Sequence, residues 1–103
     1  AVSGVPGAAT AHFALHPCVP NPFNPMTTIK FELPQTTRTT LRIYDIAGRL
    51  VQTLADNVVL EAGSHEVVWR GGDSSGRVVA AGTYFCRMEA GAFRGTQRMT
   101  LVK

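Results

Sequence analysis

Three prolines fall within six residues of this chain, in the run Pro-Asn-Pro-Phe-Asn-Pro at residues 20–25. Each proline fixes its φ angle, removes a backbone donor and pushes the preceding residue into an extended conformation. The run therefore excludes a helix and a central strand, and it predicts a stiff entry segment with an aromatic side chain as its apolar anchor. The residues of this entry motif are Pro20, Asn21, Pro22, Phe23, Asn24 and Pro25.

Downstream of the entry motif, apolar and polar residues alternate with a period of two, which is typical of half-buried strands. Strands are expected over residues 28–33, 39–44, 49–54, 65–70, 77–80, 83–90 and 96–102, with a connection over 55–63. Short strands at this spacing, separated by Gly and Asp turns, predict an all-β antiparallel sandwich of about seven strands. Its expected core residues are Ile29, Phe31, Leu41, Ile43, Val67, Trp69, Tyr84, Met88, Met99 and Leu101.

The segment upstream of the motif has a different composition, because residues 1–29 contain no Asp, Glu, Lys or Arg. We therefore divide the 103-residue chain into an extended N-terminal segment, residues 1–17, and a sandwich domain, residues 18–103. Residues 12–16 alternate weakly and predict a short strand. The segment either folds onto its own sheet or adds to the open sheet edge of a neighbouring copy. Val2, Val5, Phe13 and Leu15 are the side chains expected to mediate such assembly.

The charge pattern predicts an ordinary solvated surface. The net charge is +3, and eight arginines and two lysines are scattered singly among the acids. No basic run or stripe is present, so a nucleic-acid partner is not expected. No apolar run approaches the roughly 20 residues that a membrane span needs. Because the chain begins with Ala1, we expect it to be processed from a longer protein.

The chain has two cysteines, which lie far apart in the sequence. Cys18 lies just before the entry motif, and Cys86 lies in the strand expected over residues 83–90. In small domains of exported proteins an even cysteine count favours a disulfide, and here such a bond would stabilise the fold by about 4 kcal/mol through loop closure. The alternative is two buried free thiols too far apart to bond. A metal site is not expected, because two cysteines without clustered histidines give too few ligands.

No catalytic or cofactor-binding site is predicted. His12, His16 and His65 have no recognisable partner for acid–base chemistry, and no Ser or Cys lies in a nucleophile motif. Asp45 and Asp73 each begin an Asp-x-x-Gly turn, in which turn chemistry explains the carboxylate better than calcium does. We therefore expect a non-enzymatic domain without a cofactor or a bound metal.

Several motifs together closely resemble the C-terminal sorting domains of type IX secretion cargo and the related immunoglobulin-like domain of the flagellar hook-capping protein. The matching segments are residues 16–25, 27–34, 41–49, 62–69, 71–76 and 82–85, so the resemblance covers roughly residues 15–103. It implies a seven-stranded, immunoglobulin-like β-sandwich, a secreted or cell-surface destination in a bacterium with an outer membrane, and no enzymatic activity. The chain departs from the family at Arg70, where Asp is frequent, and at Cys18 and Cys86.

Two functions are consistent with these features. The first is a secreted structural module that self-assembles with copies of itself, plausibly into a fibre, through its N-terminal segment. The alternative is a sorting domain that outer-membrane type IX secretion machinery recognises on a larger cargo protein. A carbohydrate- or surface-binding accessory module is a third hypothesis.

Overall fold

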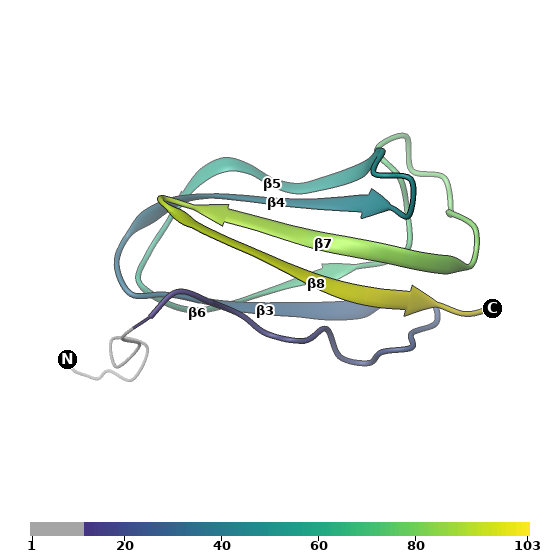
Figure 1. Cartoon of the computed structure of the whole chain (residues 1–103), viewed down its shortest axis with the longest axis horizontal. Coiled ribbons are helices and arrows are strands. Elements are labelled where there is room, and N and C mark those ends of the chain that lie inside the picture. Colours follow the sequence, from purple (N-terminus) through teal and green to yellow (C-terminus); the bar gives the residue numbers. More distant parts are fainter. Residues whose placement is uncertain (1–11) are drawn as a thin grey trace.

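The computed structural model describes residues 12–103, which fold into two antiparallel sheets packed face to face (Figure 1). The strand order is β2-β3-β6 in one sheet and β5-β4-β7-β8 in the other. This arrangement confirms the predicted all-β sandwich. The strands are β2 (Ala14–Leu15), β3 (Thr27–Leu33), β4 (Thr37–Asp45), β5 (Leu50–Leu60), β6 (Gly63–Trp69), β7 (Gly82–Ala90) and β8 (Phe93–Leu101).

The core lies between the two sheets and follows from the period-two alternation of the strands. In β3, for example, Ile29, Phe31 and Leu33 are fully buried, while Lys30 between them is exposed. Every predicted core residue is buried except Val67, which is half-buried and packs against the core. Cys18, Phe23, Leu33, Cys86 and Ala90 complete the buried apolar set.

The aromatic side chains at one end of the core form a connected group. The Trp69 ring lies 5.5 Å from Phe23 and 5.3 Å from Tyr84, measured between ring centroids. The indole N–H of Trp69 donates to the Gly72 carbonyl at 2.9 Å, and the Tyr84 hydroxyl donates to the Ala80 carbonyl at 2.6 Å. Their polar atoms are thus satisfied, as burial of these rings requires.

Two parts of the predicted strand pattern are wrong. The expected connection over 55–63 is instead the second half of β5, which continues to Leu60, and β6 begins at Gly63. An edge strand with a bulge explains the error, because the register with β4 shifts around Thr39 and Leu41 and the β5 side chains do not alternate cleanly between buried and exposed. The expected strand over 77–80 does not form, and only an isolated bridge between Gly72 and Val78 stands in its place.

Candidate interaction surfaces

The entry motif connects the two sheets along one long side of the sandwich. Just before it, Val19 exchanges two backbone hydrogen bonds with Thr28 at the start of β3, at 2.9 and 3.1 Å. Four residues later, Phe23 donates to the Thr100 carbonyl at 2.9 Å and accepts from the Val102 N–H at 3.0 Å. The segment therefore crosses from the three-stranded sheet to the outer edge of β8, and it covers that edge (Figure 1).

Asn21 supplies hydrogen bonds that the prolines beside it cannot make. Its side-chain amide donates to the Arg98 carbonyl at 3.0 Å and accepts from the Thr100 N–H at 3.0 Å. The side chain thereby imitates a peptide group of a neighbouring strand against β8. Upstream, the Gln97 amide donates to the Leu15 carbonyl at 2.9 Å and continues the contact between the segment and β8.

The predicted assembly residues divide into two groups. Val2 and Val5 lie outside the described residues. Phe13 and Leu15 pack against the core of their own subunit, where the Phe13 ring stacks on Phe93 with centroids 5.5 Å apart. Leu15 also pairs with Phe31 as part of β2. These two side chains would have to leave their own sandwich before they could bind a neighbour.

Cys18 and Cys86 are both buried in the common core, and the structure holds them as free thiols. The structure therefore does not contain the predicted bond, which stays a prediction for experiment. Burial raises the pKa of the Cys18 thiol to about 11. Burial, together with the nearby Cys18, also raises the pKa of the Cys86 thiol. Both groups are thus protonated at neutral pH and poor nucleophiles.

Two of the three histidines share a shallow groove on the three-stranded sheet. This groove of about 250 Å³ is lined by His16, Glu32 and His65, among others. The His16 Nε2 contacts the Glu32 carboxylate, and His65 Nε2 contacts the Glu61 carbonyl at 2.7 Å while its ring stacks on Phe31. Within residues 12–103, no group of three or more His, Cys, Asp or Glu side chains is placed to hold a metal ion.

The two Asp-x-x-Gly turns have the same hydrogen-bond pattern. Asp45 Oδ1 accepts from the N–H groups of Ala47 and Arg49, both at 2.9 Å. These hydrogen bonds hold the pKa of the Asp45 carboxyl below its usual value, and the bond from the Arg49 N–H is the largest cause. Asp73 Oδ1 accepts from Ser75 and Arg77 in the same way, and the Ser75 hydroxyl is the largest cause of its lowered pKa. Each carboxylate thus accepts hydrogen bonds from backbone N–H groups of its own turn.

On the other long side of the sandwich, β5 and β6 are terminal strands of their sheets. The loop after β6 covers part of β5, because Ser74 donates to the Val51 carbonyl at 3.0 Å and Gln52 donates to the Asp73 carbonyl at 2.9 Å. A groove of about 340 Å³ remains between the two strands, with Val68 in its lining. No described segment pairs with the outer edge of β6.

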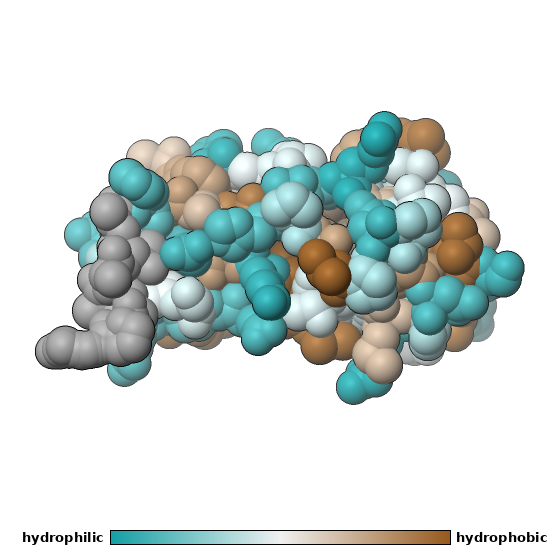
Figure 2. Space-filling view, turned by 90° about the horizontal axis from the view of Figure 1, so that it is seen from below, coloured by the Kyte–Doolittle hydropathy of each residue, from teal (hydrophilic) through white to brown (hydrophobic). Residues whose placement is uncertain are grey.

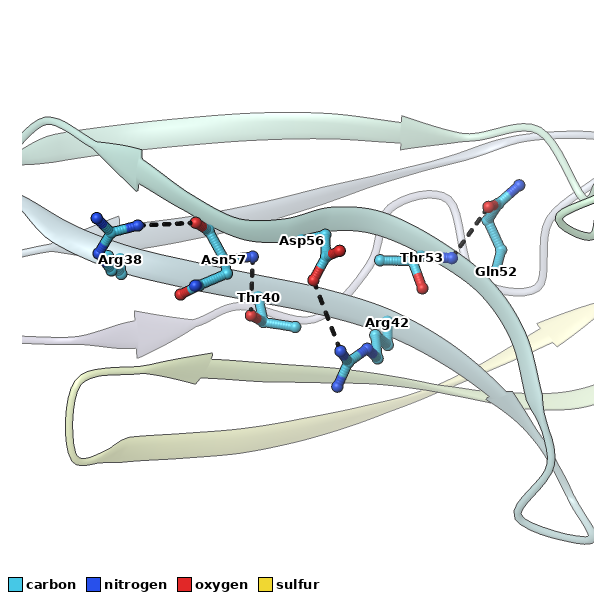
Figure 3. Close-up of polar contacts among 7 residues, drawn as sticks. All are labelled: Arg38, Thr40, Arg42, Gln52, Thr53, Asp56 and Asn57. Atoms are coloured by element: carbon cyan, nitrogen blue, oxygen red, sulfur yellow. Dashed lines mark hydrogen bonds and ion pairs between the residues drawn. The ribbon is translucent and has the colours of Figure 1, made fainter.

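The bulged half of β5 is tied to β4 by polar side chains (Figure 3). The Asn57 N–H donates to Thr40 Oγ1 at 3.1 Å, and Arg38 Nη1 donates to the Asn57 carbonyl at 3.4 Å. Asn57 has a positive φ of 54°, which asparagine tolerates better than most residues. A bulge of this kind distorts the strand edge and hinders pairing with another chain.

Figure 2 shows the side of the molecule that lies at the bottom of Figure 1. Among the described residues visible there, brown apolar atoms lie in separate spots, divided by teal and white residues. The described residues also contain no helix long and apolar enough to cross a membrane.

These features define a class of protein, the immunoglobulin-like β-sandwich, here with an entry motif that covers the edge of β8. A family model described as the FlgD Ig-like domain matches residues 23–92. The chain therefore belongs to the family of FlgD Ig-like domains. A search of curated proteins finds no match.

Solved structures share this fold at low sequence identity. PorU from Porphyromonas gingivalis, described in a dimeric latent form, has a TM-score of 0.65 and 20% identity over 91% of this chain and 10% of its own. PorZ from the same organism, described as an essential surface component of the type IX secretion system, has a TM-score of 0.60 and 21% identity over 87% of this chain and 12% of its own. FlgD from P. aeruginosa has a TM-score of 0.58 and 24% identity over 73% of this chain and 59% of its own. The chain thus spans about a tenth of PorU and PorZ, and about three fifths of FlgD.

Proposed function

We propose that this chain is a non-catalytic interaction module at the cell envelope or outside the cell, and that type IX secretion machinery recognises it on an exported protein. The observation that carries the proposal is the entry motif. It is part of the sequence pattern that resembles sorting domains, and it lies along the edge of β8 with some of its side chains exposed to solvent. PorZ, a type IX component, and PorU contain a domain of the same fold.

The structure separates two kinds of residue in the motif. Asn21 and Phe23 hold the segment against the sandwich through hydrogen bonds and burial. Asn24 is exposed and forms no hydrogen bond with another described residue. A receptor that binds the motif on the folded domain would therefore contact Asn24, while Asn21 and Phe23 hold the motif in position.

The experiment fuses this chain to the C-terminus of a periplasmic reporter in a bacterium with a type IX system. We expect the reporter to reach the medium or the cell surface, and to stay in the periplasm when the translocon gene is deleted. Asn24→Ala should reduce export without changing the melting temperature of the domain. Val19→Ala, at a neighbouring residue that is 62% exposed, is the matched control and should leave export unchanged. Export that persists without the translocon would contradict the proposal.

Self-assembly is a second candidate, and the uncovered edge of β6 supports it. Two exposed valines lie at or near this edge: Val68 on β6 is 42% exposed, Val78 in the following loop is 70% exposed, and both line the groove beside β5. An extended segment from another copy could add to such an edge through main-chain hydrogen bonds. Because Phe13 and Leu15 are packed in their own subunit, the incoming segment would have to come from residues 1–11.

Light scattering after size-exclusion chromatography tests this second function. We expect the full chain to form multimers, and we expect deletion of residues 1–11 or the edge variant Val68→Lys to give monomers. Each variant must keep the melting temperature of the parent chain. A monomeric full chain at high concentration would rule out this form of assembly, and it would leave the export proposal untouched.

A further inference from the structure

The outward face of the four-stranded sheet gathers most of the arginines of the chain. Because side chains alternate across a strand, the even-numbered residues of β4 and β8 and the odd-numbered residues of β7 all point away from the core. Five of the eight arginines occupy such positions. We define this arginine face as Arg38, Arg42, Arg87, Arg94 and Arg98.

The strand register arranges these side chains in rows. Arg42 of β4 lies directly opposite Arg87 of β7. Arg94 and Arg98 of β8 lie in the rows on either side, opposite Glu89 and Phe85 of β7. Directly opposed side chains of neighbouring strands have Cβ atoms about 5 Å apart, and like charges at this spacing destabilise a sheet. The Arg42–Arg87 pair is thus an arrangement that folding alone disfavours.

Carboxylates neutralise this face only in part. Arg42 points toward Asp56 (Figure 3), and its Nη2 lies 3.7 Å from Asp56 Oδ1. Arg87 Nε lies 3.9 Å from Glu89 Oε2. Both contacts are long, and the Asp56 side chain is 76% exposed, so solvent weakens them. Asp45 adds a third carboxylate, because it lines the groove beside this face. Five arginines therefore face three carboxylates, and two positive charges remain in excess.

An aromatic row borders the arginine pair. Tyr44 lies directly opposite Phe85, one row along the strands from Arg42 and Arg87, and both rings are half-buried on the outward face. Both rings and two of the arginines, Arg87 and Arg94, line an open groove of about 400 Å³. Rows on the same face of a sheet are about 7 Å apart, so the aromatic row lies next to the arginine pair.

We propose that the arginine face binds an acidic polysaccharide. Its carboxylate, sulfate or phosphate groups would bridge Arg42 and Arg87, where guanidinium groups match oxyanions in geometry. The apolar face of a sugar ring would lie on Tyr44 or Phe85. This inference rests on the side-chain arrangement and does not depend on the proposed export function.

The position of the face within the sheet favours a polysaccharide over an acidic peptide. β4 and β7 are interior strands, paired on both sides, so a peptide gains no main-chain hydrogen bonds there. A polysaccharide binds through ring faces and charged substituents and needs no strand edge. The groove is open, which suits an extended polymer better than a small molecule that must be enclosed.

The test compares Arg42→Gln/Arg87→Gln with Arg70→Gln/Arg77→Gln in the full chain. Both double variants lose two positive charges, but Arg70 and Arg77 lie outside the arginine face and form no ion pair with a described carboxylate. Isothermal titration calorimetry would use polygalacturonate and heparin, with neutral dextran, polyglutamate and single-stranded DNA for comparison. We expect the first variant to weaken polysaccharide binding about tenfold or more, and the control to change it less than about threefold.

Phe85→Ala supplies a separate readout, because it leaves every charge in place. We expect it to weaken binding to polygalacturonate, and we expect neutral dextran to show no binding to any variant. Circular dichroism and the melting temperature establish that each variant is folded. Equal losses in both arginine variants would show non-specific charge attraction and overturn the proposal. Tighter binding of polyglutamate or DNA than of both polysaccharides would also overturn it.

Discussion

Replacing Phe23 with alanine tests whether the entry motif is part of the fold or a tether attached to it. The Phe23 side chain is 1% exposed and packs on Trp69, and its backbone pairs with the end of β8. Removing a buried phenyl group costs about 3–5 kcal/mol, counting the lost burial and the cavity. A domain of this size is stable by only about 5–15 kcal/mol. We therefore expect Phe23→Ala to lose roughly half of the stability.

Urea unfolding followed by Trp69 fluorescence measures this loss, because the indole moves from the core to water as the domain unfolds. Phe23→Leu keeps most of the apolar volume and should cost about 1–1.5 kcal/mol, which keeps the test usable if the alanine variant fails to fold. Val19→Ala alters an exposed side chain in the same segment and should stay within about 0.5 kcal/mol. A cost below about 1 kcal/mol for Phe23→Ala would refute our account of the segment.

Three further predictions concern polar groups. Asn21→Ala should lower the free energy of unfolding by about 1–2 kcal/mol, because it removes two hydrogen bonds to β8. Urea unfolding measures this change, and a smaller loss would show that water replaces both hydrogen bonds. The pKa values of Asp45 and Asp73 are lowered in the folded state. Their ionised carboxylates therefore stabilise the fold above the usual pKa of 3.8, and this stabilisation is lost as the pH falls through the folded pKa values. Thermal unfolding at pH 7 and pH 3 should therefore show a smaller drop for Asp45→Asn/Asp73→Asn than for the parent, and equal drops would contradict this. Native Cys18 and Cys86 should react slowly with Ellman's reagent because both thiols are buried with raised pKa values. Unfolding without reductant should release two thiols, whereas release of none would establish the disulfide.

The alternation of side chains carried most of the fold prediction. In β3, β7 and β8, buried and exposed residues follow the period of two closely enough to predict both the strand and its inward face. β5 lacks this regularity, because it is a terminal strand whose bulge changes the register with β4. A bulge is specified by contacts between strands, such as that of Asn57 with Thr40, and no local pattern predicts such contacts.

The entry motif and the arginine face show a second limit of prediction from the sequence. The prolines predicted a stiff segment with Phe23 as an anchor, but they could not predict which strand it would lie against. The expected core positions Leu41 and Ile43, and likewise Tyr84 and Met88, place Arg42 and Arg87 on the opposite, outward faces of their strands by alternation. The pairing of β4 with β7 and of β7 with β8, which brings them onto one face, is a property of the tertiary structure. Single arginines scattered in sequence therefore become a cluster only after the sheet has formed.

The three surfaces of this sandwich centre on different residues, although the entry motif and the arginine face both involve β8. The entry motif covers the edge of β8, where Asn21 donates to the Arg98 carbonyl. The uncovered edge belongs to β6, and the Arg42–Arg87 pair of the arginine face lies on the interior strands β4 and β7. A substitution at Asn24, Val68 or Arg42 changes one surface and leaves the buried core intact, because all three side chains lie outside it. We therefore expect single-surface variants to separate the proposed export, the proposed assembly and the proposed polysaccharide binding. Loss of all three in Phe23→Ala would instead reflect the unfolding of the shared core.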